Sequence, residues 1–374
     1  MKPPLDNTDS LPQGQISNTN VPYQITGMRA YGIDLCRIMA MSMVVMLHLL
    51  GHGGALAATP QGSLSKHVLL LLHAECSCAV VLFFLVSGWL LAPKSLNLDR
   101  LLRLAVKVYL ISFLVRIIAI PLSVSAGWKS FFADYWFWNA YLIVMATLPI
   151  LNPGIQLICE KVNSLKLWVL LSALVCLRAM LPMIGVDNNY EPLWFCIPYT
   201  VGAALRLKKP CPDRHRYLYL FLAIFIPAFG KTIRFIGLKT GIDIPVFFLP
   251  THYHSPLVLA TGMCWLLFFT SLHIRKLPYL LRQASAAAFG VYLLHEHPIV
   301  RTSLVKNRFS ALGNLHVPEL LGALFLALVL IYASSMVVDR TLSFLLDRLQ
   351  IDSRCRNLCK RFSSLLKPHS KAVF

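Results

Sequence analysis

Arg37 and His48 stand at the two ends of an apolar run, Arg37-Ile-Met-Ala-Met-Ser-Met-Val-Val-Met-Leu-His48, that contains no other ionisable group. In an α-helix this separation corresponds to about three turns, so both side chains lie on one face, roughly 16 Å apart along the axis. A histidine can exchange protons near neutral pH, and an arginine can bind an oxyanion. Because ionisable groups are costly inside a lipid bilayer, this polar face predicts a functional site if the segment is a membrane helix.

The composition of the chain indicates that this segment is a membrane helix. Of the 374 residues, 57% are hydrophobic and 14% are charged, whereas soluble domains carry about 25% charged residues. Apolar segments recur without a polar interval that could fold separately. We therefore expect an all-α, polytopic membrane helix bundle with about ten transmembrane helices, over residues 32–50, 68–92, 104–122, 135–152, 167–184, 192–205, 217–230, 256–274, 284–300 and 318–338.

The ends of the chain are polar. Residues 1–28 show no apolar period, so we expect a disordered cytoplasmic arm before an integral membrane domain over residues 29–340. No apolar core precedes a cleavage site, so the first helix is expected to be an uncleaved anchor. Residues 341–374 are expected to form a basic cytoplasmic tail that contacts lipid headgroups.

The formal net charge of +19 could indicate a nucleic-acid partner, but the basic residues are distributed by loop. With the N-terminus inside, the inner loops and their flanks carry fourteen Lys and Arg residues, and the outer loops carry eight. This asymmetry favours both termini in the cytoplasm and a multi-pass membrane location, and we expect no nucleic-acid partner.

Further polar groups fall within or beside the expected spans. Arg100 and Arg103 share a helical face at the inner surface, where they could hold phosphate or serve as basic anchors. Ser87 and Gly88 are small, which favours close helix packing. Groups that fall in the expected spans, most of them toward the outer side, are His73, Glu75, Arg116, Asn139, Tyr141, Tyr292 and His295.

A metal site is not expected. His48 and His52 stand four positions apart, but Leu49 replaces the glutamate of a His-Glu-x-x-His site, and Gly51 to Gly54 indicate that the helix has ended. Most of the ten cysteines fall in or beside apolar segments, and we expect them to be packing thiols.

Five motifs, in this order, resemble the membrane acyltransferase-3 family: Arg37 with ten residues before His48, Phe84-Leu-Val-Ser87-Gly88-Trp89, Arg100-Leu-Leu-Arg103, Trp136-Phe-Trp138-Asn139-Ala-Tyr141 continuing to Leu148-Pro149-Ile-Leu-Asn152, and Gly290-Val-Tyr292-Leu-Leu-His295. The resemblance covers most of the membrane region and looks closest to stand-alone bacterial members associated with surface polysaccharides. The sequence departs from the family at Trp89, where Phe or Tyr is frequent. It also lacks the extracytoplasmic hydrolase-like domain that some members carry, so the need for a separate partner stays open.

The resemblance implies transfer of an acetyl or similar acyl group from cytoplasmic acetyl-coenzyme A to a sugar hydroxyl outside the bacterial inner membrane. A sugar hydroxyl needs a general base to attack a thioester, and His48 suits that role, although a covalent acyl-histidine is an equal alternative. Arg100 and Arg103 are expected to hold the coenzyme A phosphates, and Arg37 to guide the pantetheine arm and act with His48. The groups expected at the acceptor are His73, Glu75, Arg116, Asn139, Tyr141 and His295, while Ser87, Gly88 and Tyr292 are expected to be structural.

Other classes of protein fit the same residues. Buried Arg, Glu and His are ordinary in a transporter or flippase for a small anion or a lipid-linked sugar, although no internal inverted repeat is visible. An inactive relative that scaffolds a polysaccharide assembly complex is a third interpretation. The fate of labelled acetyl-coenzyme A separates the three.

Overall fold

The computed structural model describes residues 31–94, 98–120, 135–180, 192–208, 213–242, 244–245, 249–351, 353–354 and 357. Every regular element in these residues is helical, which confirms the all-α class. The residues from Tyr31 onward group into one unit. The expected cytoplasmic arm, 1–28, lies outside the described residues.

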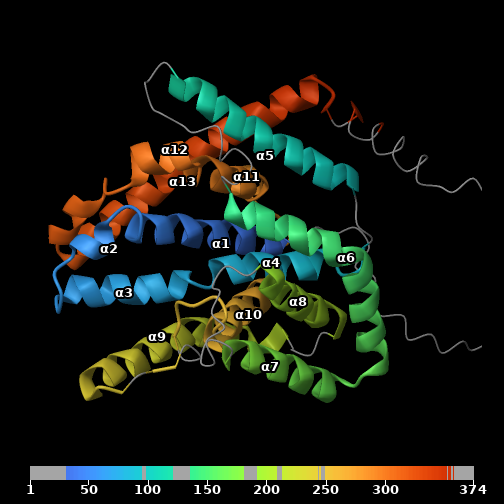
Figure 1. The fold of residues 1–374 in the computed structure, drawn as a ribbon, viewed down its shortest axis with the longest axis horizontal. Helices are drawn as coiled ribbons and strands as arrows, with labels where there is room; N and C mark the ends of the chain where they lie inside the picture. Colours follow the sequence, from blue (N-terminus) through green and yellow to red (C-terminus); the bar gives the residue numbers. More distant parts are fainter. Residues whose placement is uncertain are drawn as a thin grey trace, which may run out of the picture. The chain divides into compact units, whose positions relative to one another are not determined.

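Each of the ten expected spans coincides with helix (Figure 1). The main helices are α1 (Tyr31–Leu50), α3 (Leu64–Cys76), α4 (Ala79–Leu91), α5 (Leu98–Ala119), α6 (Trp136–Lys161), α7 (Ser164–Met180), α8 (Cys196–Lys208), α9 (Arg216–Thr240), α10 (Pro256–Thr270), α11 (Tyr279–His295) and α13 (Val317–Arg348). Two short helices, α2 (Ala55–Ala58) and α12 (Pro298–Val300), lie in connections.

Five helical stretches in the described residues are long and apolar enough to cross a membrane: Tyr31–Leu50, Leu64–Leu91, Trp136–Lys161, Asp213–Thr240 and Val317–Arg348. The chain is therefore an all-α membrane helix bundle. Ten crossings and the inward orientation of both termini stay predictions.

The second expected span is interrupted at Ser77 and Cys78, between α3 and α4. The Ser77 hydroxyl donates to the His73 carbonyl oxygen at 2.7 Å, a local bond of the kind that competes with regular helix geometry. The interruption brings Ser77 into the wall of a cavity next to His73.

Helices α9 and α13 each run ten residues beyond their expected ends, and α13, which ends at Arg348, includes the start of the expected tail 341–374. The extension of α9 replaces part of an expected loop. We expected this span to end at residue 230 and an outer loop to follow, but the helix runs to Thr240, so Lys231, Arg234 and Lys239 are helical. Its 25 residues measure about 37 Å, which exceeds the roughly 30 Å of a hydrocarbon core. The last turns of α9 can therefore stand outside the apolar layer.

Helix α1 is the centre of the bundle. It packs against α11 and α13 on one side and against α3 and α4 on the other, and it also contacts α10 (Figure 1). Helices α3, α4 and α11, which bring side chains close to His48, are thus placed by contact with α1.

The tightest helix pair is α4 with α8. A Cβ added to Gly88 would overlap the Tyr199 carbonyl oxygen, and one added to Gly202 would overlap the Leu85 carbonyl oxygen. Two glycines facing opposite backbones let the helices touch, which is the arrangement that small residues allow in membrane helices. The neighbouring Ser87 donates its hydroxyl to the Phe83 carbonyl oxygen at 2.8 Å within α4.

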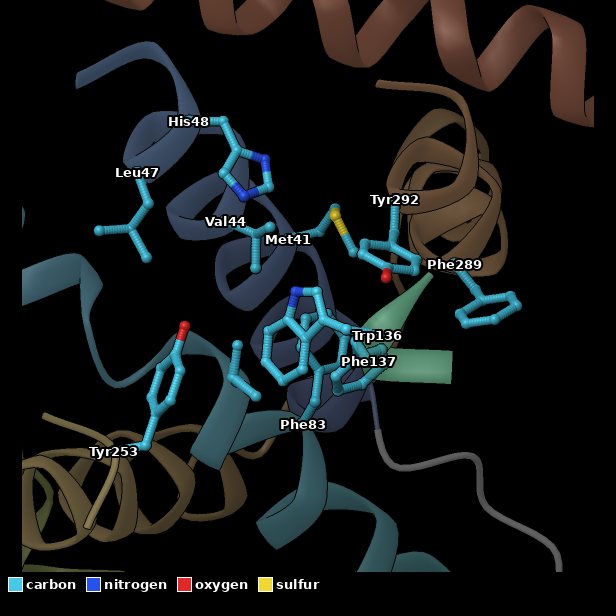
Figure 2. A pocket seen from close by; sticks show the side chains of 11 residues that line it. Met41, Val44, Leu47, His48, Phe83, Trp136, Phe137, Tyr253, Phe289 and Tyr292 are labelled. Carbon is cyan, nitrogen blue, oxygen red and sulfur yellow. The ribbon is translucent and has the colours of Figure 1, made fainter. Parts of the chain in front are cut away.

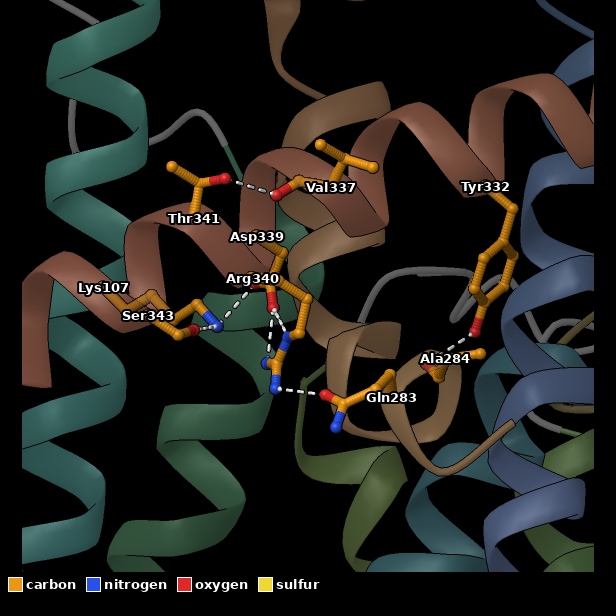
Figure 3. A network of polar contacts seen from close by, with 9 residues as sticks. All are labelled: Lys107, Gln283, Ala284, Tyr332, Val337, Asp339, Arg340, Thr341 and Ser343. Carbon is orange, nitrogen blue, oxygen red and sulfur yellow. Dashed lines mark hydrogen bonds and ion pairs between the residues drawn. The ribbon is translucent and has the colours of Figure 1, made fainter. Parts of the chain in front are cut away.

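A buried ionic network joins α5, α11 and α13 (Figure 3). The fully buried Asp339 accepts from Lys107 Nζ at 2.5 Å and from Arg340 Nη2 at 2.7 Å. Arg340 Nη1 also donates to Gln283 Oε1 at 3.3 Å. A Cβ on Gly290 would overlap the Asp339 carboxylate, so this glycine leaves the space in which the carboxylate lies.

Candidate active site

His48 lies near the C-terminal end of α1 and contacts the C-terminal end of α11. Its Nδ1 is 2.9 Å from Nε2 of His295, and the His295 Nδ1 is 2.6 Å from the Val291 carbonyl oxygen. A carbonyl oxygen can only accept, so the His295 Nδ1 carries a proton and, in a neutral ring, its Nε2 is an acceptor. The His48 Nδ1 therefore donates to His295, which leaves the lone pair of His48 on Nε2.

This lone pair is directed at a cavity. In Figure 2 one ring nitrogen of His48 faces the side of Tyr292 and α11, and the other points into the pocket above Trp136. A neutral imidazole in this tautomer, with Nε2 toward open space, has the form that a general base or a nucleophile requires.

Glu296 follows α11 directly and places a carboxylate beside the same imidazole. Its Oε2 is 3.1 Å from the His48 Nδ1, and its Oε1 accepts from Arg301 Nη1 at 2.6 Å. The Glu296 side chain is 3% exposed, and a carboxylate so deeply buried needs the opposite charge that Arg301 supplies. The negative charge next to Nδ1 would stabilise the imidazolium that forms when Nε2 takes up a proton.

His48 stands between two cavities of different character. The apolar pocket, with a volume of about 40 Å³, is narrow and follows one face of α1 (Figure 2). Its lining is Met41, Val44, Leu47, His48, Val80, Phe83, Trp136, Phe137, Tyr253, Phe289 and Tyr292. It has room for a group of only a few atoms, since a cavity needs about 10–15 Å³ by this kind of measure to hold one water.

The second cavity, the polar vestibule, has a volume of about 410 Å³. Its lining is Leu47, His48, His52, His73, Ser77, Trp136, Thr251, Tyr253, Glu296 and Arg301. Burial and the nearby Arg301 charge lower the pKa of His52, so this imidazole is neutral at pH 7. A polar molecule much larger than the apolar pocket would hold can approach the His48 Nε2 from this side.

Arg37 lies on the same face of α1 as Met41, Val44 and His48, about one turn before Met41, which lines the apolar pocket. Its Nη1 donates to the Ser285 hydroxyl at 3.5 Å, and that hydroxyl donates to Asp34 Oδ1 at 2.8 Å. Ser285 of α11 thus bridges Arg37 and Asp34 of α1.

Arg100 belongs to the same end of the molecule as Arg37. Both guanidinium groups lie close enough to the Tyr141 hydroxyl to interact with it electrostatically. Arg100 and Arg103 are exposed in the first two turns of α5. A positively charged end, a narrow apolar pocket, an imidazole and a polar vestibule therefore follow one another along α1.

A family model for an acyltransferase domain, acyltransferase 3, matches residues 30–338. The chain belongs to the acyltransferase-3 family. This confirms the resemblance of the five motifs, and the protein is an acyltransferase. Searches of curated proteins and of solved structures gave no significant match.

In this acyltransferase the residues expected at the acceptor lie in different parts of the structure. His73 lines the vestibule with His48, His295 contacts His48 directly, and Tyr141 lies with the arginines at the opposite end. The remaining three, Glu75, Arg116 and Asn139, are not among the described residues that line the two cavities.

Two of those three have identifiable surroundings. Glu75 Oε1 accepts from the Trp265 indole at 2.9 Å, which joins α3 to α10. Arg116 is 3% exposed within α5, one turn after Ser112, whose hydroxyl is 3.4 Å from the His297 Nε2. Tyr292, which we expected to be structural, lines the apolar pocket.

Sequence reasoning missed Glu296 and Arg301. A signal for Glu296 was present, because an acidic residue beside His295 falls inside the expected span 284–300, where an unpaired carboxylate is costly. Helix α11 runs from Tyr279 to His295, so that expected span was displaced by five residues at each end. Arg301 was counted only as an outer-loop charge, and no periodicity marks it as the partner of Glu296.

The segment that carries Thr251 and Tyr253 into the vestibule also holds a fully buried histidine, His254. Its Nε2 is 3.3 Å from Arg178 Nη2, and its ring is 5.0 Å from that of Trp194. These contacts fix the segment against α7 and the turn before α8.

The possible donor atoms of His48, His295 and Glu296 lie within 4.8 Å of one another. Among the described residues, this is the group of His, Cys, Asp and Glu side chains that lies close enough together to hold a metal ion. The 2.9 Å between the two imidazole nitrogens is a hydrogen-bond distance, whereas two nitrogens on tetrahedral zinc stand about 3.3 Å apart. Glu296 is already paired with Arg301. The arrangement fits a hydrogen-bonded relay better than a metal centre.

The family departure at Trp89 has a local partner. The Arg206 guanidinium of α8 lies 5.3 Å from the centroid of the Trp89 ring, and the larger, more electron-rich ring of tryptophan strengthens such a cation–π contact. In this member of the family the substitution supports the α4 and α8 pair.

Proposed function

We propose that this acyltransferase transfers an acetyl group from cytoplasmic acetyl-coenzyme A to a hydroxyl of a surface polysaccharide or its lipid-linked precursor, in a bacterial inner membrane. The observation that carries the proposal is the position of His48, which lines both the narrow apolar pocket and the polar vestibule and points one ring nitrogen into the apolar pocket (Figure 2). The small apolar pocket suits an acyl group, and the larger polar vestibule suits a sugar.

The donor is assigned to the arginine end. Arg100 and Arg103 bind the phosphates of coenzyme A, because a guanidinium forms paired hydrogen bonds with phosphate oxygens. Arg37 guides the pantetheine arm toward Met41 and Val44, which line the apolar pocket. The acetyl thioester then reaches the imidazole from the pocket side.

The acceptor enters from the vestibule and is activated there. The His48 Nε2 takes the proton of the sugar hydroxyl while the hydroxyl oxygen forms a bond to the thioester carbonyl carbon. The imidazolium is stabilised by Glu296 at 3.1 Å and by its hydrogen bond to His295. When the carbon–sulfur bond breaks, the coenzyme A thiolate leaves and takes the proton from Nε2.

A covalent route uses the same atom. In that route Nε2 attacks the thioester first, coenzyme A leaves, and the sugar hydroxyl then displaces the acyl group from His48. The two routes separate in the absence of acceptor, where only the covalent route gives labelled protein that hydroxylamine discharges.

The experiment uses inverted membrane vesicles with labelled acetyl-coenzyme A. We expect label on polysaccharide or lipid-linked sugar with the wild-type protein, none with His48→Ala at equal protein level, and wild-type transfer with His67→Ala. His67 is a matched control, because its Nδ1 bonds to the Ser63 carbonyl oxygen of its own helix start.

Normal transfer by His48→Ala would remove His48 from the mechanism. Movement of label or of a lipid-linked sugar across the membrane without covalent transfer would favour a transporter or flippase. Comparing polysaccharide O-acetylation with and without the gene would identify the acceptor.

A further inference from the structure

We propose that the polar vestibule selects an acceptor sugar that carries an oxyanion, a carboxylate or a phosphate, near the hydroxyl that is acylated. This inference rests on the proposed function, because it names the class of acceptor that the same site takes. It is carried by three sets of contacts around the vestibule.

The first set of contacts is made by Arg301, which lines the vestibule and pairs with Glu296. Its Nη1 is occupied by Glu296, and its side chain is 34% exposed, whereas the Glu296 side chain is 3% exposed. The negative member of the ion pair is thus buried and the positive member faces the cavity. A guanidinium held by one nitrogen keeps its other donors for a ligand, in a plane that matches a carboxylate or phosphate.

The second set lies near His73, a vestibule residue of α3, and comes from α9. Lys231 and Arg234 lie close enough to the His73 imidazole to interact with it electrostatically. The His67 ring is 6.1 Å from that of Phe235, so α9 runs antiparallel along α3 at this level. The extension of α9 beyond the expected loop start therefore brings two cations to the wall that His73 forms.

The third observation is that little negative charge balances these cations. Among the vestibule residues Glu296 is the acidic one, and it is paired with Arg301. His52 and His73 add hydrogen-bonding groups rather than carboxylates. An anion in the vestibule can contact Arg301, which lines the cavity, while Lys231 and Arg234 add positive charge near His73. A low-dielectric surrounding strengthens such interactions.

The oxyanion belongs to the acceptor and not to coenzyme A. The donor phosphates have their own cations, Arg37, Arg100 and Arg103, at the other end of α1. Arg37 and His48 are separated by about three helical turns, roughly 16 Å. The vestibule also has the volume and aromatic lining, from Trp136 and Tyr253, that a sugar ring needs.

The test is binding by the purified full-length protein in lipid nanodiscs. The probes are a uronic-acid oligosaccharide and the same oligosaccharide with its carboxyl groups reduced to alcohols. We expect the wild-type protein to bind the acidic probe about tenfold more tightly, a difference that one charge-assisted contact can supply. Lys231→Gln with Arg234→Gln should lose most of that preference and leave binding of the reduced probe unchanged.

Lys239→Gln is the matched control. This lysine is on the same helix, two turns beyond Lys231, and its Nζ lies 5.8 Å from the centroid of the Phe235 ring. It should keep the preference. A neutral sugar on a polyprenyl diphosphate, compared with the same sugar on an uncharged polyprenyl ether, determines whether the oxyanion is the lipid carrier's phosphate.

Equal binding within both probe pairs would overturn the inference, as would a loss in the double variant that is equal for charged and uncharged probes. Acetyl transfer is measured with the same probes to separate the two proposals. A charge preference without transfer from acetyl-coenzyme A would refute the proposed function alone, and transfer without a charge preference would refute this inference alone.

Discussion

The His48 Nδ1 and the His295 Nε2 lie 2.9 Å apart, although the two residues are separated by 247 positions in the sequence. The contact joins the ends of α1 and α11, and the Val291 carbonyl oxygen at its far side fixes which nitrogen carries each proton. The direction of the His48 lone pair is therefore set by a backbone group that never meets a substrate.

Removing the acceptor of this hydrogen bond should lower the rate of the chemical step. In His295→Ala the His48 ring can take either tautomer and rotate, so we expect kcat to fall about 100-fold, the lower range for a positioned general base. The KM for acetyl-coenzyme A should change little. Steady-state kinetics in nanodiscs, with acceptor in excess, measure both constants.

Glu296→Gln tests the charge separately from the tautomer. It keeps the shape of the side chain but removes the stabilisation of the imidazolium, so kcat should fall while binding of acetyl-coenzyme A stays constant. His67→Ala controls for loss of an unrelated histidine. A relay role for His295 and Glu296 is refuted if either variant raises only the KM.

The arginine pair should act on donor binding. Arg100→Ala and Arg103→Ala are each expected to raise the KM for acetyl-coenzyme A at least tenfold, because each removes charge-assisted bonds to phosphate. Replacement by lysine should restore part of the loss, since a point charge lacks the planar fork. Titration of initial rate against acetyl-coenzyme A gives the comparison.

A matched substrate sharpens this prediction. Acetyl-dephospho-coenzyme A lacks one phosphate, and an arginine that binds this phosphate should show no further loss with it. Lys161→Ala, at the end of α6, is the control for a basic residue of the same expected side. Equal, additive losses for both donors would assign the arginines to membrane anchoring.

The apolar pocket should determine acyl-chain length. With a volume of about 40 Å³, it should favour acetyl over butyryl transfer by at least about tenfold, since surplus methylenes are rejected at roughly 1–3 kcal/mol each. Phe83→Ala enlarges the pocket and should reduce that ratio. The measurement is kcat/KM for acetyl- and butyryl-coenzyme A with one acceptor.

Phe225→Ala removes the same ring from an exposed position of α9 and should leave the ratio unchanged. If Phe83→Ala lowers both activities in proportion, the pocket does not select the acyl group.

The α4 and α8 crossing should be sensitive to a single methyl group. Gly88→Ala forces a Cβ onto the Tyr199 carbonyl oxygen, and such overpacking costs about 1–3 kcal/mol. Gly154→Ala in α6 meets no atom within 4 Å and should be neutral or slightly stabilising, because alanine favours helix over glycine. Thermal unfolding in detergent compares the two, and equal midpoints would contradict the close packing.

Removal of metal ions should leave acyl transfer unchanged. Dialysis against EDTA, followed by metal analysis, tests whether the His48, His295 and Glu296 group functions as a relay. Loss of activity that added zinc restores would instead assign these three donors to a metal centre.

Much of the fold follows from the apolar pattern of the sequence, because a membrane helix needs a long apolar run and each expected run is helical. The helix boundaries that failed depend on local signals that the apolar pattern does not contain. Nothing near residue 230 ends α9, since the stop is Gly241 in the left-handed conformation, with φ at 73°. The interruption at Ser77 rests on one side-chain bond that competes with the helix.

For the site, helical spacing placed Arg37 and His48 on one face, and the motifs placed His295 and the arginine pair. Spacing could not supply Glu296 or Arg301, because their importance comes from a contact between the ends of α1 and α11. The assignment of Glu75 to the acceptor was based on the cost of a buried carboxylate, and Trp265 supplies a partner for that carboxylate elsewhere.

The meeting of Gly290 and Asp339 has a consequence for biogenesis. Translation delivers α1 first and α13 last among the described membrane helices, yet α13 brings the carboxylate that lies against α11 and pairs with Lys107 of α5. Until that last helix is inserted, the α11 face that carries Gly290 and the lysine of α5 both lack their partner. We therefore expect the α1 and α11 pair, which carries the proposed catalytic histidine, to reach its final packing only after α13 is inserted.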